Sequence, residues 1–181
     1  MFLPSGRSEK MIVLVLGGTR SGKSEFAEHL VSQLPSPATY LATATSVDDD
    51  PTFLQRIAAH RRRRPAAWAT IETGAGLAAA LSRSTGTVLV DSLGTWLAAH
   101  WDFAADEAAL CNALTGRVGD TVIVSEEVGL GVHAPTELGR RFADRLGEVN
   151  QAVGSISDRV LLVVAGRALD LRPPSELSPP L

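Results

Sequence analysis

Eight residues near the start of the chain, 17–24, constrain its fold more than any other stretch. They read Gly-Gly-Thr-Arg-Ser-Gly-Lys-Ser, which fits the phosphate-binding pattern Gly-x-x-x-x-Gly-Lys-Ser/Thr. An apolar run at 11–16 precedes them, and an expected helix at 25–34 follows. In such a strand–loop–helix unit, the glycines let backbone N–H groups turn toward phosphate oxygens, and the helix start adds further N–H groups. We therefore expect a bound nucleoside triphosphate, with Lys23 reaching its β- and γ-phosphates and Ser24 ligating Mg²⁺.

The composition limits the classes of protein that fit. The chain has 181 residues, of which 45% are hydrophobic and 20% are charged, as in ordinary globular domains. Its formal net charge of −3 argues against a broad basic surface, so we expect no nucleic-acid partner. No apolar run approaches the ~20 residues of a membrane-spanning helix, so we expect no membrane span. Cys111 is the only cysteine, which is typical of a reducing compartment and predicts a cytoplasmic protein.

Apolar runs alternate with stretches of helical periodicity along the chain. The expected strands are 11–16, 38–43, 68–72, 87–91, 120–125 and 160–166. The expected helices are 25–34, 53–64, 74–82, 93–114 and a long helix that opens near Pro135. This alternation predicts an α/β fold like that of P-loop NTPases, with a mostly parallel central sheet flanked by helices on both faces. We expect a single domain at 11–171, between a flexible N-terminal extension at 1–10 and a disordered, proline-rich tail at 172–181.

Polar residues at the ends of the expected strands point to a common crevice. Ligands of open parallel sheets bind beyond the carboxyl ends of the strands, where the small and hydroxyl residues 43–45 lie. The run 87–90 ends at Asp91, which is the pattern of a carboxylate that holds Mg²⁺ or the nucleotide. The alternative is that Asp91 is simply a turn-favouring residue after a strand. Glu72 ends another strand in the same way.

The segment from His60 to Arg64 has three interpretations. Four consecutive arginines, 61–64, form a nucleic-acid or localisation patch, a solvated helix end, or a cluster that binds phosphates through guanidinium groups. In the third case the neighbouring His60 is a candidate nucleophile toward phosphorus, whereas otherwise it is structural. The aspartates 48–50 are interpreted as helix-capping residues rather than as a metal site.

Four segments also match the motifs of one enzyme family. They are residues 17–24, similar to G-G-[AT]-R-S-G-K-S; residues 40–44, similar to Y-[IL]-A-T-[AS]; residues 60–72, similar to H-x-x-x-R-P-x-x-W-x-T-x-E; and residues 127–151, similar to E-V-G-x-G followed by R-x-F-x-D-x-x-G-x-x-N-Q. Together they resemble the bifunctional adenosylcobinamide kinase / adenosylcobinamide-phosphate guanylyltransferase family of cobalamin biosynthesis. The likeness extends over residues 11–170, approximately.

The resemblance implies two reactions on one fold. First, ATP or GTP phosphorylates the aminopropanol hydroxyl of adenosylcobinamide. Second, GTP transfers GMP to adenosylcobinamide phosphate through a guanylyl-histidine, giving adenosylcobinamide-GDP and pyrophosphate. The histidine of the family maps onto His60, which stands five residues before Pro65. The resemblance also suggests a homo-oligomer.

The resemblance further implies the residues of the site. His60 and Lys23 would be catalytic, and Ser24 and Asp91 would hold Mg²⁺. Both Glu72 and Asp91 are chemically able to accept from the N–H groups of guanine or to bind ribose hydroxyls. The nucleotide contacts are Gly17, Gly18, Thr19, Arg20, Ser21, Gly22, Lys23, Ser24, Thr43, Ala44, Thr45, Arg61, Arg62, Arg63, Arg64, Glu72 and Asp91.

Three departures from the family pattern are visible. Asp91 stands where some relatives have Glu, and the arginine run is more basic than usual. Ser125-Glu126 replaces the commoner Thr-Asn or Ser-Asn, which adds a second carboxylate near the crevice. The alternative functions are a P-loop kinase of another small-molecule alcohol, with His60 structural, and a nucleotide-sensing or nucleic-acid-binding module, against which the acidic net charge argues.

Overall fold

The computed structural model describes residues 10–44, 65–131 and 134–176. The helix expected at 53–64 lies outside the described residues, as do 1–9 of the expected extension and 177–181 of the expected tail. In the part of the chain that is described, no helix is both long and apolar enough to cross a membrane.

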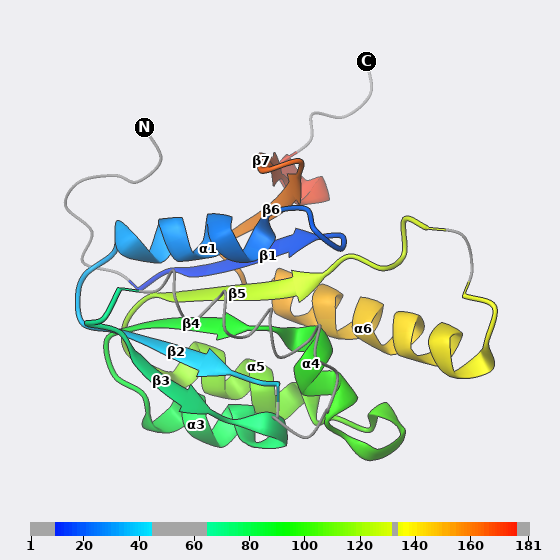
Figure 1. The fold of residues 1–181 in the computed structure, drawn as a ribbon, viewed down its shortest axis with the longest axis horizontal. Coiled ribbons are helices and arrows are strands. Elements are labelled where there is room, and N and C mark those ends of the chain that lie inside the picture. Colours follow the sequence, from blue (N-terminus) through cyan, green and yellow to red (C-terminus); the bar gives the residue numbers. More distant parts are fainter. Residues whose placement is uncertain (1–9, 45–64, 132–133, 177–181) are drawn as a thin grey trace.

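Seven strands of the described chain form one sheet, in the order β3-β2-β4-β5-β1-β6-β7 (Figure 1). Six of them are parallel, and β7 pairs antiparallel with β6 at one edge. The mostly parallel sheet expected from the sequence is therefore confirmed. The strands are β1 Ile12–Gly17, β2 Ala38–Ala42, β3 Ala69–Glu72, β4 Thr87–Asp91, β5 Thr121–Glu126, β6 Arg159–Val164 and β7 Arg167–Leu171.

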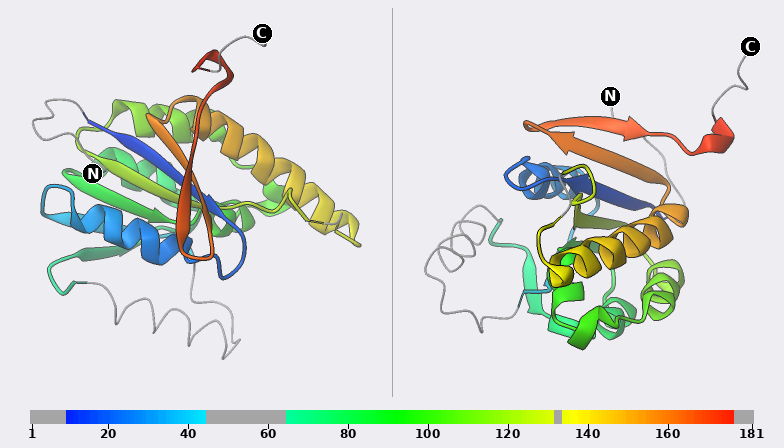
Figure 2. Two further views of the ribbon diagram at one scale, coloured as in Figure 1. Left: turned by 90° about the horizontal axis from the view of Figure 1, so that it is seen from above. Right: turned by 90° about the vertical axis from the view of Figure 1, so that its right-hand side faces the viewer.

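Helices cover both faces of the sheet, and they do so unequally (Figure 2). On one face, α1 packs through Ala27 and Val31 against alternate residues of the central strands. The opposite face packs against the other four α-helices of the described chain. The helices are α1 Lys23–Ser32, α3 Leu77–Arg83, α4 Leu93–Ala98, α5 Glu107–Gly116 and α6 Glu137–Ser155.

The central strand β1 shows why the sequence produces these layers. All six of its residues are buried, and their side chains alternate between the two faces of the sheet. Leu14 packs on the face covered by α6 and its neighbours, and Val15 packs on the face covered by α1. A strand covered on both sides has no solvent-facing position, so its sequence is continuously apolar rather than alternating. Burial of each such side chain contributes about 1.5–3 kcal/mol relative to exposure, so this strand is a major contributor to the stability of the core.

The prediction of one continuous helix at 93–114 is wrong. The segment forms α4, a 3-10 turn at Trp101–Phe103, and then α5. Asp102 and Phe103 both have positive φ angles, 56° and 57°, which an α-helix cannot contain. Asp106 then starts α5 by accepting a hydrogen bond from the Ala109 N–H with its side chain.

The sequence predicts a single strand at 160–166 here, whereas the structure has β6 followed by a second strand, the edge strand β7. The chain turns at Ala165 and Gly166, whose φ angles are 51° and 71°, and returns as an antiparallel hairpin. Two successive positive φ angles are typical of the tight turns that join twisted hairpins. After β7 the chain makes a 3-10 turn at Pro174–Glu176, within the tail that we expected to be disordered.

Candidate active site

The loop between β1 and α1 has the backbone of a phosphate-binding nest. Arg20 and Gly22 have φ angles of 58° and 91°, and the Ser21 N–H donates to the Gly18 carbonyl oxygen over 3.2 Å. Gly22 is the N-cap of α1 and supplies no side chain to the helix start. The first N–H groups of a helix have no partner within it, so this end attracts anions. The ten-residue helix thus presents its positive end at the loop.

Close contacts fix this loop against the last hairpin of the chain. A Cβ atom at Gly17 would lie 2.5 Å from the Ser21 hydroxyl and 2.8 Å from the Val163 carbonyl oxygen. The Ser21 carbonyl oxygen accepts a 2.8 Å hydrogen bond from the Gly166 N–H, in the β6–β7 turn. The conformation of the loop therefore depends on residues almost 150 positions later in the chain.

Lys23 lies where the loop and the end of β5 meet. Its ammonium nitrogen is 3.4 Å from the Gly18 carbonyl oxygen and 3.8 Å from Oε1 of Glu126. Only 13% of the Lys23 side chain is exposed, so the charge is directed over the loop rather than into solvent. A cation in this place can bind the phosphates of a triphosphate as a point charge.

Asp91 faces the start of α1 from the end of β4. Its Oδ1 is 3.4 Å from the Ser24 hydroxyl, and its Oδ2 accepts a 2.6 Å hydrogen bond from Tyr40. A hydroxyl and a carboxylate are hard oxygen donors of the kind that Mg²⁺ takes together with phosphate oxygens. The described residues contain no group of three or more His, Cys, Asp or Glu side chains that could hold a metal. The donor set thus fits an ion that completes its shell with phosphate and water.

Thr43 supports the turn that carries Asp91. Its side chain is fully buried, and its hydroxyl donates to the Ser92 carbonyl oxygen and accepts from the Ser92 N–H, at 2.7 and 2.8 Å. The Thr43 N–H donates to the Asp91 carbonyl oxygen over 3.2 Å. Thr95 adds a 2.5 Å hydroxyl contact with Thr43 from the first turn of α4. These bonds extend the pairing of β2 and β4 past the ends of the strands.

Glu72 and Ala44 lie toward the β3 side of the same edge. Ala42 of β2 is the register partner of Glu72 on one side and of Asp91 on the other. The two carboxylates therefore stand at the ends of β3 and β4, with β2 between them. Glu72 is exposed and Ala44 is partly buried. The remaining predicted site residues, His60, Thr45 and Arg61–Arg64, lie outside the described residues.

Several contributors to this site were not among the predicted residues. Tyr40, Ser92 and Thr95 support Asp91 and its turn, and Ser92 with Thr95 forms a reciprocal capping box at α4. The sequence signal for the capping box was the spacing Ser-x-x-Thr directly after a strand. Asn150 of α6 accepts a 2.6 Å hydrogen bond from Ser125 and donates to the Glu126 carbonyl oxygen over 3.1 Å, which fixes the end of β5.

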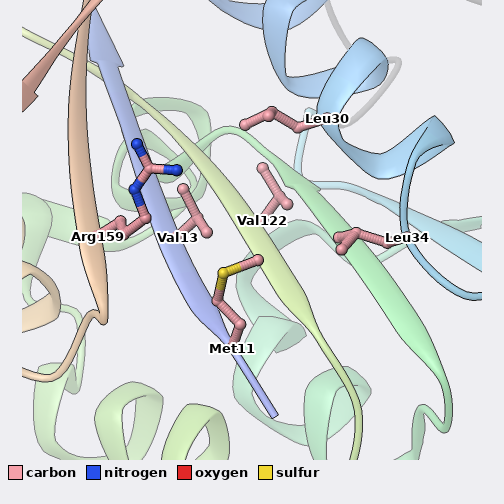
Figure 3. A pocket seen from close by; sticks show the side chains of 6 residues that line it. All are labelled: Met11, Val13, Leu30, Leu34, Val122 and Arg159. Carbon is pink, nitrogen blue, oxygen red and sulfur yellow. The ribbon is translucent and has the colours of Figure 1, made fainter. Parts of the chain in front are cut away.

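A second concave feature lies under α1 and is not part of this site. Figure 3 shows its lining, which is apolar apart from Arg159. The volume is about 10 Å³, which is no more than one water molecule needs, so this hollow binds no nucleotide. The lining residues are Met11, Val13, Leu30, Leu34, Val122 and Arg159.

The sheet order, the loop of residues 17–24 and the facing Asp91 define a P-loop nucleotide-binding protein. In agreement, the fold is similar to the solved structure of an ATPase from the type III secretion system of pathogenic bacteria, with a TM-score of 0.51 and 11% identity. That similarity covers 84% of this chain and 50% of the other, and it concerns the fold alone.

Sequence comparison defines the family. Residues 13–171 match the family model described as cobinamide kinase / cobinamide phosphate guanyltransferase, and the chain belongs to this family of bifunctional enzymes. The bifunctional adenosylcobalamin biosynthesis protein CobP of Pseudomonas aeruginosa is 38% identical, over 88% of this chain and 96% of the relative. The corresponding protein CobU of Salmonella typhimurium is 32% identical, over 90% of this chain and 100% of the relative. The family resemblance of the four motifs is confirmed.

Proposed function

We propose that the chain carries out both transfers of its family at the P-loop, first phosphorylating adenosylcobinamide and then attaching GMP from GTP to the phosphate. The observation that supports this most directly is the approach of Ser24 to Asp91, 3.4 Å between side-chain oxygens, at the helix start that also carries Lys23. This is the arrangement that phosphoryl transfer requires, because catalysis there consists mostly of positioning and charge stabilisation.

In the phosphorylation step, the backbone N–H groups of the loop and Lys23 would hold the phosphates of the donor, ATP or GTP. Lys23 would stabilise negative charge on the oxygens of the γ-phosphoryl group as it leaves the donor. Ser24 and Asp91 would hold Mg²⁺, which supplies further charge neutralisation between the β- and γ-phosphates. Tyr40 and Thr43 would keep Asp91 in place from the strand beside it.

In the guanylyl step, we assign the nucleophile to His60 on the strength of its place in the family motif. A neutral imidazole nitrogen would use its lone pair to form a bond to the α-phosphorus of GTP. The bond between that phosphorus and the bridging oxygen would break, and pyrophosphate would leave with the electron pair. A phosphate oxygen of the corrinoid substrate would then attack the same phosphorus and release the imidazole, so that one difficult transfer becomes two.

The remaining assignments follow the same resemblance. The arginines 61–64 would favour the neutral imidazole and offset phosphate charge. Glu72 and Asp91 are both candidates to bind guanine or the ribose hydroxyls. Of the predicted contacts 43–45, Ala44 and Thr45 would line the nucleotide, whereas the fully buried Thr43 would support the turn that carries Asp91. A homo-oligomer and a cytoplasmic location also stay proposals, favoured by the family likeness and by the single cysteine.

The test is labelling of the protein with GTP that carries ³²P at the α-position. The wild type should acquire label that is lost in acid and stable in base, as expected of a phosphoramidate. GTP labelled at the γ-position should leave no label, because that phosphorus departs with pyrophosphate. Addition of adenosylcobinamide phosphate should discharge the label into adenosylcobinamide-GDP.

Variants separate the proposal from the alternative kinase. His60→Ala should abolish the label, whereas His29→Ala, at an exposed histidine of α1, should not change it. Undiminished label in His60→Ala would refute the assigned nucleophile. If wild-type protein phosphorylates a different alcohol and never acquires label, the chain is a P-loop kinase of that alcohol.

A further inference from the structure

Glu126 is the last residue of β5, and its carboxylate connects two parts of the site. The Ser92 hydroxyl lies 2.9 and 3.0 Å from its two oxygens, and the Gly94 N–H donates to Oε2 over 3.0 Å. On the other side, Oε1 is 3.8 Å from the Lys23 ammonium nitrogen. The carboxylate therefore lies between the turn that follows Asp91 and the lysine of the P-loop.

The packing around Glu126 leaves little freedom for this side chain. A Cβ atom at Gly94 would overlap Oε2 and lie 3.0 Å from the carboxyl carbon, so the glycine lets the carboxylate approach the start of α4. Ser92 is 3% exposed, and burial makes its hydroxyl dependent on an acceptor. The Glu126 side chain is 28% exposed, so it is only partly shielded from solvent.

We propose that Glu126 is a positioning residue for Lys23, which it holds while no triphosphate is bound and yields to the β- and γ-phosphates on binding. The inference rests on the proposed placement of the triphosphate at the P-loop. Glu126 has two separable functions in this assignment. Its oxygens accept from Ser92 and Gly94 and fix the turn after Asp91, and its charge competes with phosphate for the lysine.

The separation follows from side-chain chemistry. A neutral amide at position 126 still offers an oxygen to Ser92 and Gly94, but it has no charge with which to hold an ammonium group. The glutamate of this chain thus adds a competitor for Lys23 that a neutral side chain would not provide.

The test compares nucleotide affinity in Glu126→Gln and wild type by calorimetry, with GTP and with GMP. Removing the competing charge should lower the Kd for GTP by about 1.5-fold to fivefold, which corresponds to the free energy of ~0.2–1 kcal/mol expected for a partly exposed ion pair. The Kd for GMP should not change, because GMP has no β- or γ-phosphate to take the lysine. An unchanged or weakened affinity for GTP would overturn the inference.

A double-mutant cycle with Lys23→Met tests whether the effect passes through the lysine. The gain from Glu126→Gln should disappear when Lys23 is already Met. An equal gain in that background would mean that Glu126 repels the phosphates directly, which overturns the positioning role. If Lys23→Met does not weaken GTP binding at all, the placement of the triphosphate fails first, and that failure is distinct.

Two further variants control for folding. Glu126→Ala leaves Ser92 and Gly94 without their acceptor and should lower the urea midpoint of unfolding, whereas Glu126→Gln should keep it. Glu126→Asn is a second neutral variant, shorter by one methylene, that can replace Gln in the cycle if Gln does not fold. Its GTP affinity must also exceed that of the wild type, and a lower affinity in folded protein would count against the proposal.

Discussion

Tyr40 donates a 2.6 Å hydrogen bond to Oδ2 of Asp91, from a side chain that is only 3% exposed. Tyr40 and Ala42 point to the α1 face of the sheet, and Asp91 is the register partner of Ala42. The side chains of Tyr40 and Asp91 therefore lie on the same face as Ser24. Asp91 is thereby oriented with its other oxygen toward Ser24. A buried phenol thus sets the direction of the carboxylate to which we assign the metal.

Tyr40→Phe should weaken this orientation without opening a cavity. We expect the free energy of unfolding to fall by about 1–2 kcal/mol, since a hydrogen bond to a charged acceptor is lost. The kinase reaction should then need a higher Mg²⁺ concentration for half-maximal rate. Activity measured against Mg²⁺ concentration tests this, with Asp91→Asn as the variant that should shift it further. An unaltered Mg²⁺ requirement in Tyr40→Phe would remove Tyr40 from the site.

The first two glycines of the P-loop should respond differently to alanine. At Gly17 the added methyl group would overlap the Ser21 side chain and the Val163 carbonyl oxygen, so Gly17→Ala should lower stability by about 1–3 kcal/mol and weaken GTP binding. At Gly18, apart from its two chain neighbours, no atom of the described residues lies within 4 Å of the new Cβ. Gly18→Ala should keep the stability of the wild type.

The nucleotide affinity of Gly18→Ala is the informative measurement. Its methyl group would occupy the open space over the loop, where we place the phosphates, so the Kd for GTP should rise at least severalfold. Urea unfolding and GTP titration on the two variants separate the effects. A Gly18→Ala protein that binds GTP as the wild type does would contradict the placement of phosphate against this part of the loop.

Arg117 connects the segments that lead into β4 and β5, at the end of the sheet opposite the site. Its guanidinium donates to the carbonyl oxygens of Gly86, Gly119 and Asp120, at 2.6, 2.8 and 3.0 Å, and the residue is 5% exposed. Burial lowers the pKa of this guanidinium and Asp120 partly offsets the effect, but an arginine stays charged at neutral pH.

Removing Arg117 should therefore destabilise the fold and leave the chemistry intact. Arg117→Ala should lower the free energy of unfolding by about 2–4 kcal/mol, because three partly buried carbonyl oxygens lose their donor and a buried side chain is removed. Arg117→Lys keeps the charge but not the fork of donors, and it should recover only part of the loss. Urea denaturation measures both. A lysine variant as stable as the wild type would show that charge alone matters here.

Cys111 should react slowly with alkylating reagents. Burial raises the pKa of its thiol, and the neighbouring Glu107 carboxylate raises it further. Since the thiolate is the reactive form, the rate of iodoacetamide labelling should lag behind that of a free cysteine at pH 8 and catch up at higher pH. Glu107→Gln should speed labelling, and urea should remove the difference altogether.

The same shift predicts a dependence of stability on pH. A raised pKa in the folded state favours the neutral thiol, so the contribution of Cys111 to stability is complete below the ordinary thiol pKa of about 8.5. It is lost as the pH rises through the higher pKa of the folded state. Urea midpoints measured from pH 7 to pH 10 should therefore fall less in Cys111→Ala than in the wild type. Parallel curves would exclude a role of this thiol.

The sequence was most informative where a residue's surroundings follow from its neighbours in the chain. The expected strand at 87–91 coincides with β4, because a strand buried on both faces must be apolar throughout. The break at Asp102 escaped prediction, since the flanking segments are as apolar as a continuous helix would be. The strand β7 escaped because its five residues are all exposed and its edge position leaves only a weak pattern.

The residues of the site also divide into those that a local sequence pattern predicts and those that it does not. The loop was predicted from its spacing, which is local. The contacts of Glu126 with Ser92 and Gly94 connect residues more than 30 positions apart, so no local pattern contains them. The family likeness supplied His60, which composition and spacing alone left open between a nucleophile and a structural role. Its place in the site stays a prediction.

The position of β1 between β5 and β6 has a consequence for how this protein is made. The strand that opens the nucleotide site leaves the ribosome before its hydrogen-bonding neighbours, which begin at Thr121 and Arg159. The Gly166 N–H that holds the Ser21 carbonyl oxygen follows later still. A nascent chain therefore exposes the apolar β1 without its neighbours until β5, and then β6, have been synthesised. Truncation after β5 should yield a polypeptide that chaperones retain and that binds no nucleotide.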